Sequence, residues 1–134
     1  MRKMLSIRIG EEEFLADLCL EEAPKTCEAF ERAGEFESFV FSAKCCDAEI
    51  TYNTPIRDFE LMENEVLREE PGNVVFYSTW TAVCIFFDRC EPFGSCNKFA
   101  QVIPEDLPRL AAACRRVWEQ PGQTVTTSVI EVED

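Results

Sequence analysis

The chain has 134 residues, 46% of them hydrophobic, which is enough for one closed core and too little for two. Its formal net charge is -13, from 13 basic and 26 acidic residues, and it contains no histidine. This charge excludes nucleic-acid and membrane-surface partners, because both are bound through clustered Lys and Arg. We expect a single domain over residues 1–134 whose acidic side chains form a solvated surface.

The first residues alternate apolar and polar side chains and lack the unbroken apolar run of a signal peptide. No apolar run approaches the roughly 20 residues that span a bilayer. The sequence therefore predicts a cytoplasmic protein. In a reducing compartment, its eight cysteines are more often small buried hydrophobes, metal ligands or nucleophiles than disulfides.

The N-terminal third predicts a β-hairpin followed by a helix. Apolar and polar residues alternate over residues 5–9 and again over 14–18, with a glycine between the two segments. A helix is expected next, because Pro24 suits a first turn and Gly34 suits the position after the last turn. Helical spacing of the apolar residues places Cys27 in the core.

The middle of the chain predicts further strands and one long connection. Strand-like residues cover 36–44 and 48–53. The polar stretch 53–73 contains two prolines and predicts an irregular connection with room for one helical turn, of a length that is typical of functional or mobile loops. Residues 74–78 and 82–88 then form a hairpin, whose second strand is apolar on both faces and should be central.

The last third predicts a loop, a strand, a helix and a final strand. A cysteine-rich loop leads into a strand over 98–103. Apolar residues from Leu107 to Trp118 form one helical stripe that includes Cys114 as a packing residue. Residues 124–133 read as a strand that pairs with an early one. Many short strands with two helices predict a mainly β protein, a barrel closed by a helix at each end.

The stretch "LEEAPKTCEAFERA" resembles the start of the cyclophilin fold, where a hairpin leads into a helix with a Pro-Lys-Thr-x-Glu-x-Phe pattern. The matching residues are Pro24, Lys25, Thr26, Glu28 and Phe30. Together, "APKTCEAF", "PGNVVFYS", "AVCIFFD" and "NKFAQV" resemble a family of small bacterial and archaeal cyclophilin-like proteins whose biochemical role is uncharacterised. The resemblance implies a cyclophilin-like closed β-barrel with two flanking α-helices.

The departures from the cyclophilin pattern concern activity. Prolyl isomerases of that family carry Phe-His-Arg, Gln-Gly-Gly-Asp and Gly-x-Leu-Ser-Met-Ala-Asn runs, and the arginine of the first is central to their catalysis. This chain has none of these runs, and the corresponding region 36–53 offers no arginine. We therefore do not expect a peptidyl-prolyl isomerase, since one fold hosts many functions.

The cysteine spacing argues against a metal site. Structural zinc sites place ligands two to four residues apart and draw many others from histidine. Here Cys84, Cys90 and Cys96 are separated by five residues each, and Cys45 and Cys46 are adjacent, so that they would point to opposite faces of a strand. We expect no metal and no other cofactor.

The chemistry that remains is that of thiols and carboxylates. The absence of histidine excludes Cys-His and Ser-His-Asp arrangements. Cys96 is either a nucleophile, activated by Lys98, a carboxylate or the amides of the preceding turn, or a loop thiol without a task. The carboxylates Glu49, Asp88 and Glu91 flank the expected barrel mouth, where a pair would act as general acid and base or would form solvated strand ends.

Aromatic and amide side chains near the same mouth are the candidates for ligand binding. Trp80 lies at the expected tip of a hairpin, where a large apolar side chain suggests a binding surface or a subunit interface, so that a homodimer is favoured. Asn97 is both a donor and an acceptor. The complete candidate set for binding a small molecule is Tyr52, Trp80, Phe93, Ser95 and Asn97.

The sequence leaves two functions open. The first is a small enzyme that binds and transforms a small polar metabolite by metal-independent acid-base chemistry, with Glu49, Glu91 and Cys96 as catalytic residues. The second is a non-catalytic binding or regulatory module that presents the same pocket to a metabolite or a peptide.

Overall fold

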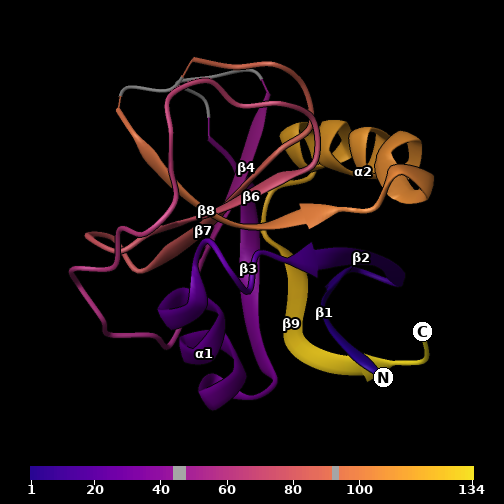
Figure 1. Cartoon of the computed structure of the whole chain (residues 1–134). Helices are drawn as coiled ribbons and strands as arrows, with labels where there is room; N and C mark the ends of the chain where they lie inside the picture. The colour runs from indigo at the N-terminus through magenta and orange to yellow at the C-terminus, as the bar shows by residue number, and fades with distance from the viewer. Residues whose placement is uncertain (44–47, 92–93) are drawn as a thin grey trace.

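The computed structural model describes residues 1–43, 48–91 and 94–134. Two helices, α1 (Pro24–Ala33) and α2 (Leu107–Glu119), lie on opposite sides of a β-barrel (Figure 1). The strands, in chain order, are β1 (Arg2–Ile9), β2 (Glu12–Leu18), β3 (Phe36–Ser42), β4 (Glu49–Asn53), β5 (Glu65–Val66), β6 (Asn73–Tyr77), β7 (Ala82–Phe86), β8 (Cys96–Val102) and β9 (Gln123–Val132).

The barrel is an antiparallel ring of eight of these strands, in the order β2, β1, β9, β3, β4, β7, β6, β8. Pairing of β2 with β8 closes the ring, from Ala16 opposite Val102 to Leu18 opposite Ala100. The last strand, β9, lies between β1 and β3, so the predicted pairing with an early strand is confirmed. The predicted fold class, a mainly β closed barrel with two helices, is confirmed.

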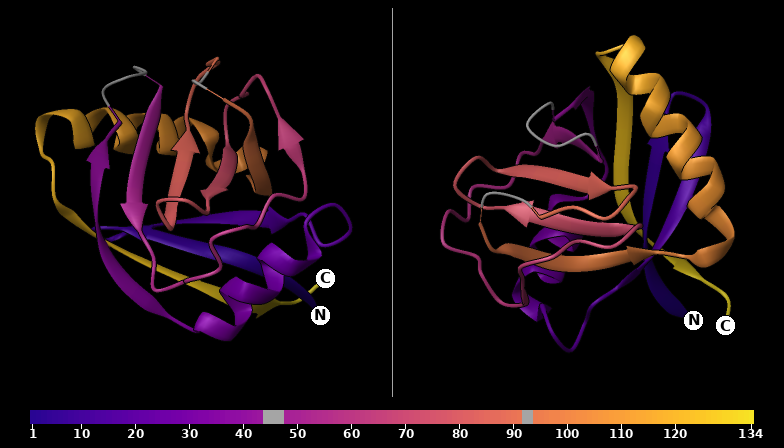
Figure 2. Two further views of the ribbon diagram at one scale, coloured as in Figure 1. Left: turned by 90° about the vertical axis from the view of Figure 1, so that its left-hand side faces the viewer. Right: turned by 90° about the horizontal axis from the view of Figure 1, so that it is seen from above.

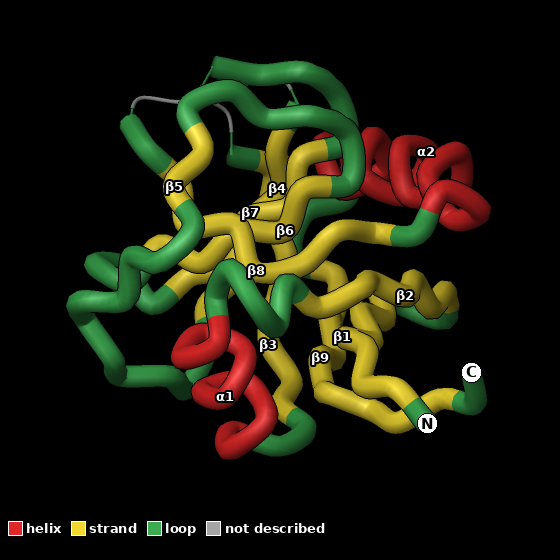
Figure 3. The backbone as a smooth tube through the Cα atoms, in the orientation of Figure 1, coloured by secondary structure: helices red, strands yellow, loops and turns green. Residues whose placement is uncertain are grey.

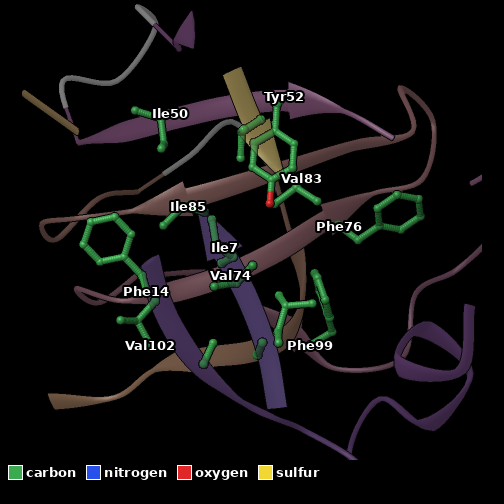
Figure 4. Close-up of a cluster of buried hydrophobic side chains, with 14 of the residues drawn as sticks. Ile7, Phe14, Ile50, Tyr52, Val74, Phe76, Val83, Ile85, Phe99 and Val102 are labelled. Atoms are coloured by element: carbon green, nitrogen blue, oxygen red, sulfur yellow. The ribbon is translucent and has the colours of Figure 1, made fainter. Parts of the chain in front are cut away.

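The barrel interior is filled by large side chains from every side of the ring. Figure 4 shows Tyr52, Phe76 and Phe99 turned into this core together with branched aliphatic residues of β4, β6 and β7. From α1, Phe30 stacks on Phe99 with ring centroids 4.3 Å apart. The Tyr52 hydroxyl forms a hydrogen bond of 2.8 Å with the Thr127 hydroxyl. Both buried polar groups therefore have a hydrogen-bond partner inside the core.

Both helices bury the stripes that their sequences predict. In α1, Cys27 and Phe30 are buried, and in α2, Leu110, Cys114 and Val117 are buried. The two views of Figure 2 show α2 along one side of the barrel, well separated from α1. Neither helix, within the described ranges, combines the length and the apolar character that a bilayer crossing requires.

The long connection between β4 and β6 differs from the prediction in one respect. It contains the short strand β5, which pairs with the start of β8 through Glu65 opposite Asn97 and Val66 opposite Cys96. No helix forms in it. A strand of two residues has no periodicity of its own, so the sequence offers no pattern that could reveal it.

Candidate functional site

Side chains on strands β4, β6 and β7 alternate between two faces, one toward the barrel interior and one toward the outside. Ile50, Val83 and Ile85 point into the barrel, whereas Cys84 and Phe86 point outward. The outward side chains are nevertheless buried, since Phe86 is 0% and Cys84 4% exposed. A second, smaller core therefore lies outside the barrel wall.

The connection between β4 and β6, residues 54–72, covers this outer face, and we call it the covering segment. Glu69 pairs with Cys90 through two backbone hydrogen bonds, of 2.7 Å from Glu69 N to Cys90 O and 3.1 Å in the reverse direction. Just before Glu69 in the connection, β5 is held beside β8, and Figure 3 shows it among the loops outside the barrel strands. This covering segment explains how polar side chains on an outer face become buried.

A group of polar side chains is enclosed beneath the covering segment, and we call it the outer cluster. Its members come from four barrel strands and from the covering segment: Glu49, Glu69, Asn73, Tyr77, Cys84 and Cys96. Glu69 is 1% exposed, and its Oε1 accepts a hydrogen bond of 3.0 Å from Asn73 Nδ2. Its second oxygen, Oε2, is buried and has no hydrogen-bond partner.

The two thiols and the tyrosine of the outer cluster are linked to the carboxyl groups. The Tyr77 hydroxyl lies 2.8 Å from Cys96 Sγ. Across the cluster, Cys84 Sγ donates to Thr51 Oγ1 at 3.4 Å. Cys84 also interacts with the Glu49 carboxyl, and Cys96 with the Glu69 carboxyl. The outer cluster is thus one connected polar network.

Burial shifts the pKa values of this network in one direction. It raises the pKa of Glu69, against the lowering effect of bonds from Asn73 and Cys96. It likewise raises the pKa of Glu49, and the charge of Glu69 adds to that shift. Two interacting carboxyls with raised pKa values are suited to acid-base chemistry, in which the protonated group gives up a proton and the ionised group accepts one.

The thiols of the outer cluster are protonated at neutral pH. Burial raises the pKa of Cys96 to about 12, and the negative charges of Glu69 and Glu49 oppose its ionisation. Burial also raises the pKa of Cys84 well above its usual range. Because the thiolate is the reactive form, this arrangement favours carboxyl rather than thiol chemistry.

The structure brings two of the three predicted catalytic residues together and separates the third. Glu49 and Cys96 belong to the outer cluster, and Glu49 is buried rather than solvated. The Glu91 side chain is 72% exposed and pairs with Arg68 at 3.2 Å. Ser95 is half-buried in the loop before β8, and Phe93 lies outside the described residues.

The other predicted binding residues lie in three different places. Tyr52 points into the barrel core, on the opposite face of β4 from Glu49. Asn97 is fully buried, where its Oδ1 accepts from the backbone N–H of Glu63 and its Nδ2 donates to Thr26 Oγ1 at 2.9 Å. Trp80 is 70% exposed in the turn between β6 and β7, as the hairpin prediction requires.

Trp80 nevertheless borders the outer cluster through Tyr77. The two rings lie tilted against each other, with centroids 5.8 Å apart. Tyr77 is only half-buried, so its ring connects the enclosed carboxyls with the surface at Trp80. This edge is the part of the outer cluster that solvent reaches.

Sequence analysis missed Glu69, Asn73, Tyr77 and Cys84 as members of one site. Alternation places Tyr77 and Cys84 on the same face of the β6–β7 hairpin, and this signal was available in the sequence. Glu69 lies in a polar stretch without periodicity, and only its backbone pairing with Cys90 turns it inward.

The described residues hold no group of three or more Cys, Asp or Glu side chains arranged to bind a metal ion. Cys90 is disulfide-bonded, although the sequence favours other roles for most of the cysteines. The other cysteines of the described ranges are free thiols: Cys19, Cys27, Cys84, Cys96 and Cys114.

Solved structures of two other proteins share this fold. One is McbB, in a structure with tryptophan, at a TM-score of 0.79 and 19% identity over 97% of this chain, which spans only 46% of the McbB chain. The other is the hypothetical protein AF2241 from Archaeoglobus fulgidus, at a TM-score of 0.70 and 22% identity over 93% of this chain and 92% of that chain. At these identities the likeness shows the fold alone.

No curated protein matches the sequence. Residues 5–129, which include every strand and helix of the barrel except the outermost ends of β1 and β9, match a family described as "Protein of unknown function (DUF3830)". The chain belongs to the DUF3830 family.

Proposed function

We propose that this protein binds and transforms a small polar metabolite at the outer cluster, with Glu69 and Glu49 as the acid-base pair. The observation that carries the proposal is the unpartnered, buried Oε2 of Glu69. A buried carboxyl oxygen without a partner is costly, and such groups in native proteins are typical of functional sites. A ligand with a hydrogen-bond donor would satisfy it.

The chemistry of the pair follows from its surroundings. Glu69 and Glu49 have raised pKa values because both are buried, and the charge of Glu69 raises the pKa of Glu49 further. Raised and unequal pKa values let one carboxyl stay protonated at a pH where the other is ionised, as general acid-base catalysis requires. The step we propose is proton transfer between these carboxyls and the bound metabolite.

Entry to the outer cluster is proposed at the Tyr77 edge. Tyr77 is half-buried and touches both Cys96 inside and Trp80 outside. Structures with this fold can be obtained with an amino acid bound, since McbB was solved in complex with tryptophan. Amino acids are accordingly the first compounds to try with this chain.

A thermal-shift screen of a metabolite library that includes the amino acids tests the proposal. We expect ligands to raise the Tm of the wild-type protein and to lose that effect in the isosteric variant Glu69→Gln, since the amide lacks the ionisable oxygen. If every ligand shifts the Tm of both proteins equally, the outer cluster is not the site. The matched control is Glu70→Gln, which changes an adjacent exposed carboxylate.

The same screen decides between the enzyme and the binding module. Ligands that bind through Glu69 are incubated with the protein and followed over time by mass spectrometry. Loss of the ligand with wild-type protein, but not with Glu69→Gln, supports catalysis. A ligand that binds and stays intact assigns the protein to the second function, a non-catalytic binding module.

We also propose the cytoplasm as the place where the protein works. The free thiols support this location, whereas the disulfide of Cys90 counts against it. Thiol titration of protein purified without oxygen would resolve the conflict: the cytoplasmic proposal requires that Cys90 is reduced under those conditions.

A further inference from the structure

We propose that the ligand of the outer cluster is a cation, a primary amine on an aromatic or apolar stem, whose ammonium group binds between Glu69 and Glu49. This inference deepens the proposed function by naming the ligand class, and it rests on that function. Its starting point is the same buried oxygen, Glu69 Oε2, to which no described residue donates a hydrogen bond of good geometry, although the Cys96 thiol interacts with the same carboxyl group.

The first argument is charge. None of the ion pairs among the described residues includes Glu49 or Glu69, although both carboxyls are buried. Buried carboxylates in proteins are normally paired with a cation. The charge of Lys98 lowers the pKa of Glu69 without forming an ion pair with it, so one cation faces two carboxyl groups. An anionic ligand would add to this excess of negative charge, and a neutral ligand would leave it in place. An ammonium group compensates it.

The second argument is the number and kind of acceptors. An ammonium group has three N–H donors and no acceptor. The outer cluster offers Glu69 Oε2, the Glu49 carboxyl and the Tyr77 hydroxyl oxygen, and Tyr77 and Glu49 interact electrostatically, so they lie near each other. Each N–H therefore has an acceptor within the same network.

The third argument is the aromatic edge. The rings of Tyr77 and Trp80 lie 5.8 Å apart, where the outer cluster reaches the surface. Trp80 is 70% exposed, which is unusual for the largest apolar side chain unless it contacts another molecule. An aromatic or apolar stem can stack on these rings while its ammonium group reaches the carboxyls.

Affinity for the amine should rise with pH. The groups that face the carboxyls are Cys84 from β7, Cys96 and Lys98 from β8 and Tyr77 from β6. Burial raises the carboxyl pKa values, whereas an ammonium ligand favours the ionised forms. Binding therefore tightens as pH rises through the raised pKa of Glu69, and Glu69→Gln makes this dependence weaker.

The test compares three probes of similar shape and different charge by isothermal titration calorimetry: phenethylamine, 2-phenylethanol and 3-phenylpropanoate. We expect phenethylamine to bind wild-type protein at least tenfold more tightly than the alcohol, with the carboxylate weakest. Glu69→Gln should lose at least tenfold in affinity for phenethylamine. Glu70→Gln, which changes an adjacent exposed carboxylate paired with Arg89, should bind like wild type.

A second variant guards against misfolding of the first. Trp80→Ala changes an exposed turn residue, so the barrel should fold as before, and we expect a loss of at least threefold in affinity for phenethylamine. Unchanged affinity would overturn the placement of the stem. Circular dichroism and Tm establish that each variant is folded before titration.

The outcomes separate this inference from the proposed function. If the library screen finds ligands that depend on Glu69 but they are neutral or anionic, or if the alcohol binds as tightly as the amine, the inference is wrong and the proposed function stands. If phenethylamine binds Glu69→Gln as tightly as wild type, the ammonium site is elsewhere. If no ligand or probe depends on Glu69, both proposals fall.

Discussion

The carboxyl of Glu69 combines full burial with an open hydrogen-bonding position. Burial raises its pKa above the usual 4.5, so the folded state binds its proton more tightly than the unfolded state does. Stability therefore decreases as pH rises from about 4.5 through the raised pKa, because folding then requires an ionised carboxyl to be buried. At neutral pH this residue works against folding, as is typical of a group kept for function.

Replacement of Glu69 by Gln should stabilise the protein. The variant removes the ionisable group, so we expect its unfolding free energy to exceed that of wild type by about 1 kcal/mol at pH 8 and to converge with it only below about pH 4.5, where both states of the wild type are protonated. Urea denaturation at several pH values measures both. A variant that is less stable than wild type at pH 8 would show that the carboxylate has stabilising partners. Glu70→Gln, at an exposed position, supplies the baseline.

Residue types and strand positions were enough to find part of the site in the sequence. The position of Glu49 beside a strand and the turn before Cys96 predict these two residues as candidates, and both belong to the outer cluster. The flanking position also predicts Glu91, yet its side chain turns to solvent. Position beside a strand fixes where a backbone lies but not which way the side chain of a loop residue points.

Helix α1 begins without a capping side chain of its own. Its N-cap residue is Ala23, which cannot accept a hydrogen bond through its side chain. Glu63, from the connection between β4 and β6, takes this role: its Oε1 accepts from Thr26 N at 2.7 Å and its Oε2 from Lys25 N at 3.1 Å. The cap therefore ties the covering segment to the helix.

Loss of this distant cap should destabilise the fold. We expect Glu63→Ala to lower the unfolding free energy by about 1 kcal/mol at pH 7, measured by urea denaturation. Partial burial opposes ionisation of Glu63, but bonds from Thr26 and Lys25 outweigh it and lower its pKa. The contribution of Glu63 is thus present above pH 4.5 and fades as pH falls through that lowered pKa.

The control for this prediction is Glu60→Ala, an exposed glutamate of the same segment. Equal stability of the two variants at pH 7 would show that the Glu63 bonds contribute nothing beyond those that water provides. Sequence analysis found the helix itself from Pro24 and Gly34, but the cap lies 37 residues away from Thr26 and has no local signature. Only tertiary structure reveals it.

The whole molecule carries a net charge of -13, and its charges meet mainly at exposed ion pairs. Repulsion among the excess carboxylates acts over distances comparable with the Debye length, so salt should relieve it. We expect the Tm to rise by a few degrees when NaCl is increased from about 10 mM to about 200 mM, which corresponds to about 1 kcal/mol in the free energy of unfolding.

Differential scanning fluorimetry measures this effect, with KCl at equal ionic strength as the comparison. A Tm that falls with salt would mean that the exposed ion pairs, such as the pair of Arg116 with Glu12, outweigh the net repulsion. A difference between the two salts would point to binding of a specific ion rather than to screening.

The barrel as a whole could be predicted from the sequence because its strands alternate and its helices carry apolar stripes. The central position of β7 followed from apolar residues on both of its faces, and the structure places it between β4 and β6. Which side chains meet on the outer face could not be predicted, because that depends on the path of an irregular segment of some twenty residues.

The position of β9 has a consequence for how the protein is made. This strand lies between β1 and β3, and the ribosome completes it after both of them and after every other part of the ring. Until it emerges, β1 and β3 each present an open edge to other chains. The ring therefore cannot close before β9 is complete, and the excess of acidic charge opposes association of the two open edges with other copies of the chain.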